Sequence, residues 1–147
     1  MLIENLLKIF DRDLNKLKEE ILLFYQKELW ITAGDVKNSA GNLCLHICGN
    51  LKHFIGAVLG NSGFVREREK EFSLKNVPKD DLLKNIDETS EIVKSTLSTI
   101  DKSILVKNFP INVFGEEMTT QYFLIHLITH LSYHLGQINY LRRLMLN

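Results

Sequence analysis

Helical spacing of apolar residues is the feature that most constrains what this chain can fold into. In the first segment, about Leu2 to Glu28, apolar residues recur three or four positions apart and charged residues fill the gaps, which is the pattern of a long amphipathic helix. Only two prolines and eight glycines occur in the 147 residues. Because helix-breaking residues are this rare, helix is favoured throughout the chain.

The second helix is expected to begin at Asn38 or Ser39, because a short polar side chain there can cap the first turn. It runs to about Gly60, where the sequence Gly-Asn-Ser-Gly ends it. This segment carries very little charge, so we expect it to be mostly buried. The following segment, Phe64 to Val77, is expected to be a connecting arm, and its charged run from Arg66 to Glu71 to be a solvated surface.

The third helix is expected to follow Pro78 and to continue to about Ile100, since proline and the acidic residues after it suit a first helical turn. The fourth is expected from Met118 or Thr119 to Met145, and the stretch 104–113 before it leaves room for a short extended piece. Four long helices joined by two longer connections predict an all-α four-helix bundle. Without an internal repeat or a low-complexity linker, residues 1–147 are expected to form one domain.

Charge and cysteine content restrict the environment and the partners. Eighteen basic residues balance eighteen acidic ones, which argues against binding to nucleic acid or to an anionic membrane. The first residues are too charged for a signal peptide, and no apolar run reaches about 18 residues, so we expect a cytoplasmic protein. Cys44 and Cys48 are too close in sequence for a useful disulfide loop and are expected to be small core residues.

Three of the five histidines lie four residues apart in the fourth helix. His126 and His134 fall about 40° to either side of His130 around the helix axis. Gln137 lies on the same side. The residues expected to be solvated lie nearly opposite: Gln121, Ser132, Asn139 and Arg143. The histidine stripe is therefore expected to face inward.

The second helix gathers polar residues on one face: Asn42, His46, Asn50 and His53. This face is either the solvent-exposed side of the helix or a polar strip that lines an interior site. The small residues Gly49 and Ala57 lie beside it and favour a lined interior site.

This pattern predicts a site for one divalent metal ion. Histidines at i and i+4 can both reach one ion, and a third from a facing helix leaves coordination positions open for water or substrate. The third would be His46. Spacing does not choose between the pairs His126–His130 and His130–His134. A histidine outside the site, such as His53, is expected to be a hydrogen-bonded core residue.

Several other kinds of site can be excluded or kept as alternatives. Ferritin-like Glu-x-x-His motifs, the zinc peptidase motif His-Glu-x-x-His, the phosphate-binding loop and the Gly-x-Ser-x-Gly elbow are all missing from the sequence. Haem held between His46 and one histidine of the fourth helix is one alternative. Another is a non-enzymatic dimeric bundle, an interaction or stress-related protein, in which the histidines are structural.

Three stretches resemble a known group of proteins. The ending His130-Leu-Ser-Tyr-His134-Leu-Gly-Gln137 resembles the final helix of the DinB/YfiT-like superfamily of metal-dependent enzymes, in which a His-x-x-x-His pair runs into a Gly-Gln step. The stretch His46-Ile-Cys-Gly-Asn50-Leu-x-His53 resembles its first ligand helix. The arm Arg66-x-Arg68-x-x-Glu71-Phe72 resembles that of an uncharacterised subfamily.

The resemblance implies which histidines bind the ion. It selects His46, His130 and His134 as the ligands of nickel or zinc, with iron or manganese as further candidates. Four other residues are then expected to orient ligands or substrate: Asn50, His53, His126 and Gln137.

The resemblance also implies a homodimeric four-helix bundle that acts on a small molecule. The implied activity is that of a transferase using a low-molecular-weight thiol such as bacillithiol, or of a metal-dependent hydrolase. It implies no DNA chemistry.

Overall fold

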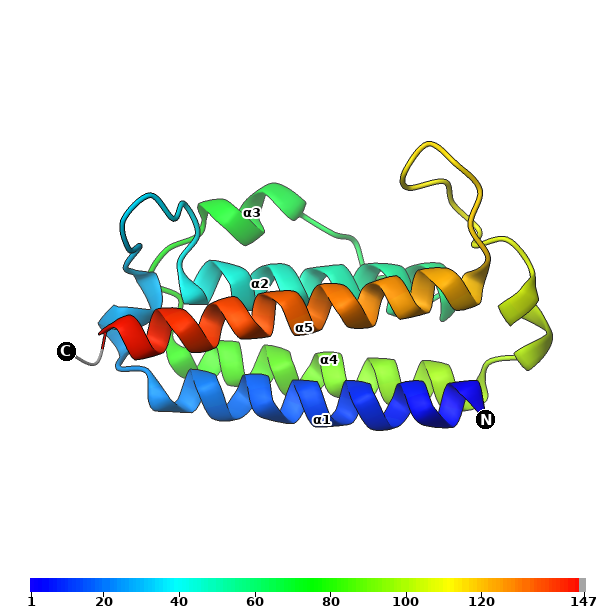
Figure 1. The fold of residues 1–147 in the computed structure, drawn as a ribbon, viewed down its shortest axis with the longest axis horizontal. Coiled ribbons are helices and arrows are strands. Elements are labelled where there is room, and N and C mark those ends of the chain that lie inside the picture. Colours follow the sequence, from blue (N-terminus) through cyan, green and yellow to red (C-terminus); the bar gives the residue numbers. More distant parts are fainter. Residues whose placement is uncertain (146–147) are drawn as a thin grey trace.

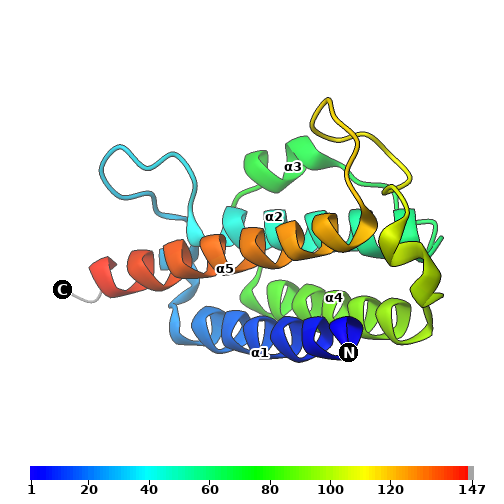
Figure 2. The same ribbon diagram turned by 45° about the vertical axis from the view of Figure 1, so that its right-hand side comes forward.

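Four long helices pack side by side in the computed structural model, which describes residues 1–145 (Figures 1 and 2). They are α1 (Leu2–Leu23), α2 (Ala40–Leu51) with its continuation η2 (Lys52–Leu59), α4 (Lys79–Thr99) and α5 (Thr120–Met145). Helix α1 packs against α4 and α5, and α2 packs against the same two helices. Within residues 1–145 the only β-pairing is an isolated bridge between Asn108 and Thr119. The predicted all-α four-helix bundle is therefore confirmed.

Helix α1 is shorter than its periodicity predicts. It ends at Leu23, because Phe24 adopts an extended backbone and places its ring in the core. The chain then makes a 3-10 turn, η1 (Gln26–Trp30), which begins with reciprocal capping contacts between Tyr25 and Glu28. Burial of the aromatic ring thus takes precedence over continuation of the helix.

Helix α2 begins where the capping residue predicts. The Ser39 side chain accepts a hydrogen bond from the backbone N–H of Asn42, and the helix starts at the next residue, Ala40. Its last part, η2, is a π-helix, which contains more residues per turn than an α-helix. The backbone leaves the helix at Gly60, after which Asn61 adopts a left-handed conformation with a φ of 52°.

The connection between α2 and α4 determines what covers α2. These two helices run in the same direction, so the chain must return along the length of α2 before α4 can begin (Figure 1). This return is made by residues 64–77, which we call the arm. Its short helix α3 (Arg68–Ser73) lies over α2.

The connection between α4 and α5 contains the expected extended piece over 104–113 only at the isolated bridge of Asn108 with Thr119. Before the bridge lies a 3-10 helix, η3 (Lys102–Val106), which the Asp101 side chain caps by accepting from the backbone N–H of Ser103. Beyond η3 the Phe109 ring stacks on Phe123 of α5.

Two predictions about the interior and the environment can be compared with the structure. Cys44 and Cys48 are free thiols buried in the core, as expected. No helix among residues 1–145 is long and apolar enough to cross a membrane.

Candidate metal centre

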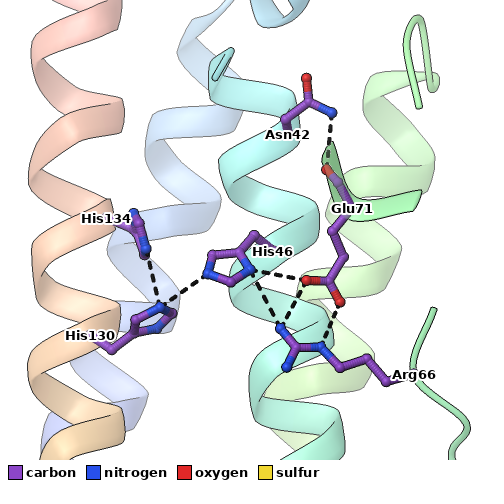
Figure 3. Close-up of polar contacts among 6 residues, drawn as sticks. All are labelled: Asn42, His46, Arg66, Glu71, His130 and His134. Carbon is purple, nitrogen blue, oxygen red and sulfur yellow. Dashed lines mark hydrogen bonds and ion pairs between the residues drawn. The ribbon is translucent and has the colours of Figure 1, made fainter. Parts of the chain in front are cut away.

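Three histidines from two helices, α2 and α5, meet between these helices (Figure 3). Nε2 of His46 lies 3.0 Å from Nε2 of His130, which in turn lies 3.1 Å from Nε2 of His134. The His46 side chain is buried, whereas His130 and His134 are partly exposed. The same ring nitrogen of each histidine thus faces a common point, and these three residues could hold a metal ion.

The far side of the His46 ring is held by the arm. Nδ1 of His46 lies 3.0 Å from Oε1 of Glu71. The Arg66 guanidinium donates to both oxygens of the same carboxylate, at 2.9 Å each. Nη2 of Arg66 also lies 3.5 Å from Nδ1 of His46. Both nitrogens are donors, and both donate to Oε1 of Glu71 rather than to each other. Burial would raise the pKa of Glu71, but hydrogen bonds from His46 and Arg66 outweigh it and lower that pKa.

The backbone of the arm is fastened at the same place. Asn42, which is completely buried one turn before His46, donates from Nδ2 to the carbonyl oxygens of Glu71 and Leu74. Lys75 donates to the Oδ1 atom of Asn42 at 2.6 Å. These contacts fix the backbone of Glu71 against α2, while His46 and Arg66 hold its side chain.

On α5 the hydrogen-bond partner of His134 is a neutral side chain. Nδ1 of His134 lies 2.7 Å from Oε1 of Gln137, one turn further along the helix. Burial lowers the pKa of His134, although the hydrogen bond to Gln137 opposes this effect. Burial, together with the neighbouring His134 and His46 rings, lowers the pKa of His130 to about 3. His130 and His134 are therefore neutral near pH 7.

A count of protons shows that these rings suit a cation. Glu71 is an ionised acceptor and Gln137 presents an oxygen, so His46 and His134 in their neutral forms carry their protons on Nδ1. Both then present a lone pair on Nε2. Neutral His130 has at most one proton on Nε2 and can donate it to only one of the two lone pairs, which leaves the other lone pair without a donor about 3 Å from Nε2 of His130. A cation at the common point would satisfy all three.

The distances also bear on the kind of cofactor. Nitrogen ligands about 2.0–2.1 Å from a tetrahedral zinc ion lie about 3.3 Å apart, close to the two contacts of 3.0 and 3.1 Å. Nitrogens this close leave no space for a haem plane between the helices. The geometry thus favours a single ion over haem.

The other predicted residues lie around the three histidines without joining them. The His126 ring packs edge-on against Phe114 of the connection before α5. His53 lies in the π-helix, where its ring contacts Phe54, and burial lowers its pKa. Oδ1 of Asn50 is buried and accepts no hydrogen bond from residues 1–145.

The α5 face was predicted only in part. The three histidines of α5 are only partly buried, and Tyr133 beside them is 64% exposed. Ser132 and Arg143 are exposed, as expected, whereas Asn139 is partly buried. Ser132 and Asn139 donate hydrogen bonds to Asp13 and Glu20 of α1.

The prediction of a solvated surface over Arg66 to Glu71 is wrong at both ends of the run. Glu71 is only 7% exposed, and the Arg66 side chain is 11% exposed, because both lie over α2 beside His46. The charged residue types predicted exposure to solvent, but the opposite charges of Arg66 and Glu71 neutralise each other beside the buried His46 ring. The sequence feature that could have indicated this burial was Gly49, three residues after His46, which leaves space for the Glu71 carboxylate.

Comparison with known proteins places the chain in a family. Residues 3–147 match the family described as "Protein of unknown function (DUF1572)". The chain belongs to this family. No curated protein matches the sequence.

Solved structures show the same fold as this DUF1572 protein. A conserved protein from Enterococcus faecalis matches with a TM-score of 0.80 at 19% identity, over 96% of this chain and 95% of that one. A DinB-like protein from Bacillus cereus matches with a TM-score of 0.73 at 20% identity, over 95% and 90% of the two chains. The DUF1572 protein thus shares its fold with a DinB-like protein, as the resemblance seen in the sequence predicts.

Proposed function

We propose that this DUF1572 protein is an enzyme that depends on one divalent metal ion, held by His46, His130 and His134. The proposal is carried by the three Nε2 atoms, which face one point with too few protons to satisfy one another. Zinc and nickel are the preferred ions, because both bind imidazole well.

The residues around the ion have separate tasks in this proposal. A bound divalent ion would lower the pKa of a thiol or water molecule, which makes it a nucleophile near neutral pH. His46, His130 and His134 would leave at least one coordination position open for that molecule. Glu71 and Gln137 hold the protons of His46 and His134 on Nδ1 and so keep the lone pairs directed at the ion.

Metal analysis tests the core of the proposal. Protein purified without a histidine tag and incubated with zinc or nickel should contain about one equivalent, and His130→Ala should contain almost none. His53→Ala is the matched control, since this histidine lies on the same helix as His46 but outside the site, and it should bind as the wild type does. Less than a tenth of an equivalent in the wild-type protein would refute the metal site.

The reaction we propose is transfer of a low-molecular-weight thiol, such as bacillithiol, to an electrophilic small molecule, and hydrolysis is the second candidate. In a test with a chlorodinitrobenzene acceptor, sulfur bonds to the ring carbon, chloride leaves and the thiol proton passes to solvent. Metal-loaded protein should catalyse this reaction, and His130→Ala should not. Cleavage of a nitrophenyl ester without thiol turnover would instead indicate a hydrolase.

An exposed apolar face on α5 supports the further proposal that the protein, which we expect in the cytoplasm, is a homodimer. Five large side chains lie within about 100° around the helix axis, beside the histidines: Tyr122, Ile125, Tyr133, Tyr140 and Leu144. Light scattering should give twice the chain mass of 17.0 kDa, and Tyr140→Asp should restore the mass of one chain. A wild-type mass of 17.0 kDa at all concentrations would exclude the dimer.

A further inference from the structure

We infer that Glu71 is a positioning residue for the metal centre, delivered to His46 by the arm and accommodated by Gly49. This inference rests on the proposed function, because it assigns a role toward the ion that His46 would bind. It concerns a residue of the arm, outside the bundle helices that supply the histidines.

The first argument is that the arm holds the His46 ring from two directions. The Glu71 carboxylate accepts from Nδ1 at 3.0 Å, and the next residue, Phe72, packs its ring against the imidazole with centroids 4.8 Å apart. A carboxylate behind a histidine ligand fixes the ring orientation and makes the metal-facing nitrogen more basic. His46 is therefore both oriented and activated by the arm.

The second argument is that a buried carboxylate here requires its own support. Glu71 is 7% exposed, and an unpaired buried carboxylate would be strongly destabilising. Arg66 provides two hydrogen bonds at 2.9 Å, and Asn42 fixes the backbone carbonyl of Glu71 at 3.0 Å. Two residues thus hold the side chain and the backbone of Glu71 behind one ring nitrogen, an arrangement that packing alone does not require.

The third argument comes from the surface of α2 beneath the carboxylate. A Cβ atom added at Gly49 would lie 2.0 Å from Oε2 and 2.6 Å from Cδ of Glu71. Glycine in a helix interior is otherwise unfavourable relative to alanine. The missing side chain therefore provides the space in which the Glu71 carboxylate reaches His46.

The test measures zinc affinity by competition with a chromophoric chelator, using the full chain. Glu71→Ala should weaken binding 10- to 100-fold. Glu71→Gln keeps an acceptor for Nδ1 but loses the charge, and should recover part of this loss. Glu67→Ala is the matched control, because Glu67 lies exposed on the same arm, paired with Lys70, and it should change the affinity less than about twofold.

Substitution of Gly49 distinguishes a role of Glu71 at the metal centre from a merely structural role. Gly49→Ala should weaken zinc binding about as much as Glu71→Ala, because it displaces the carboxylate. In the Glu71→Ala background the same glycine substitution should have no further effect on affinity. The role of Glu71 would be overturned if the losses of zinc affinity were additive in the double variant. It would also be overturned if Glu71→Gln and Glu71→Ala folded and bound zinc with wild-type affinity. Failure of the wild-type protein to bind zinc would instead refute the proposed metal site itself.

Discussion

The two helices that carry the histidines hold them in different ways. On α2, His46 is buried and has a charged partner, Glu71, that comes from the arm. On α5, His134 is partly exposed and has a neutral partner, Gln137, from the same helix. One side of the centre thus depends on a segment distant in sequence, and the other depends on a local contact.

The position of α5 is secured on a different face of that helix, away from the histidines. Ser132 donates to Asp13 of α1 at 2.7 Å, and Asn139 and Arg142 both donate to Glu20. These contacts fix the helix without touching His130 or His134. The comparison teaches that α2 combines anchoring and ligand orientation in one network, whereas α5 separates them.

The largest effect is expected from breaking the α2 network at Asn42. Asn42→Ala leaves the buried carbonyl oxygen of Glu71, the partly buried carbonyl oxygen of Leu74 and the Lys75 ammonium without their partner, so the free energy of unfolding should fall by about 3 kcal/mol. Urea denaturation measures this change. Asn5→Ala, at an exposed position of α1, is the control and should change it little. An equally small effect at Asn42 would show that the arm is held by other contacts.

A smaller effect is expected when α5 is given the kind of partner that α2 has. Gln137→Glu places a carboxylate behind His134, so zinc affinity should rise several-fold, and Gln137→Ala should lower it several-fold. Chelator competition measures both changes. The prediction fails if the charged and the apolar replacement shift the affinity in the same direction.

The contact of Glu20 on α1 with α5 should contribute about 1 kcal/mol to the free energy of unfolding, and acid should remove this contribution. Burial alone would raise the pKa of Glu20, but hydrogen bonds from Arg142 and Asn139 outweigh it and lower the pKa below its ordinary value of 4.5. Because the folded pKa is depressed, this contribution is present above about pH 4.5 and is lost as the pH falls through the folded value. Unfolding measured against pH should lose this component in Glu20→Gln, and the exposed Glu19→Gln should retain it.

The smallest effect is expected at His126. Its ring centroid lies 6.3 Å from that of His130 and it packs against Phe114, so His126→Ala should change zinc affinity by about twofold or less. The same titration measures it. A loss comparable to that of His130→Ala would mean that the i, i+4 pair has been assigned to the wrong two histidines.

Local patterns predicted the helices well, because they arise from contacts along each segment. The apolar spacing of α1 and the cap at Ser39 describe interactions between near neighbours. The end of α1 was missed because Phe24 turns into a core built by distant residues. The π-helix after Leu51 carries no sequence signal that distinguishes it from an apolar α-helix.

The candidate site was predictable only as a set of histidines. Spacing placed His130 on an inward stripe, and resemblance selected His134 as its partner; these two lie together with His46 in the structure. Glu71 was assigned to solvent because a sequence pattern reports the charge of a residue and not the buried arginine that neutralises it.

The close approach of Gly49 and Glu71 has a consequence for how the family diverges. Two positions far apart in the sequence share one small volume, so neither can change freely while the other stays the same. Homologues with a larger residue at position 49 should have lost the carboxylate at position 71, and the two changes should occur in the same lineages. Covariation of this pair would therefore separate the members that share this arm-held histidine from those that orient it by other means.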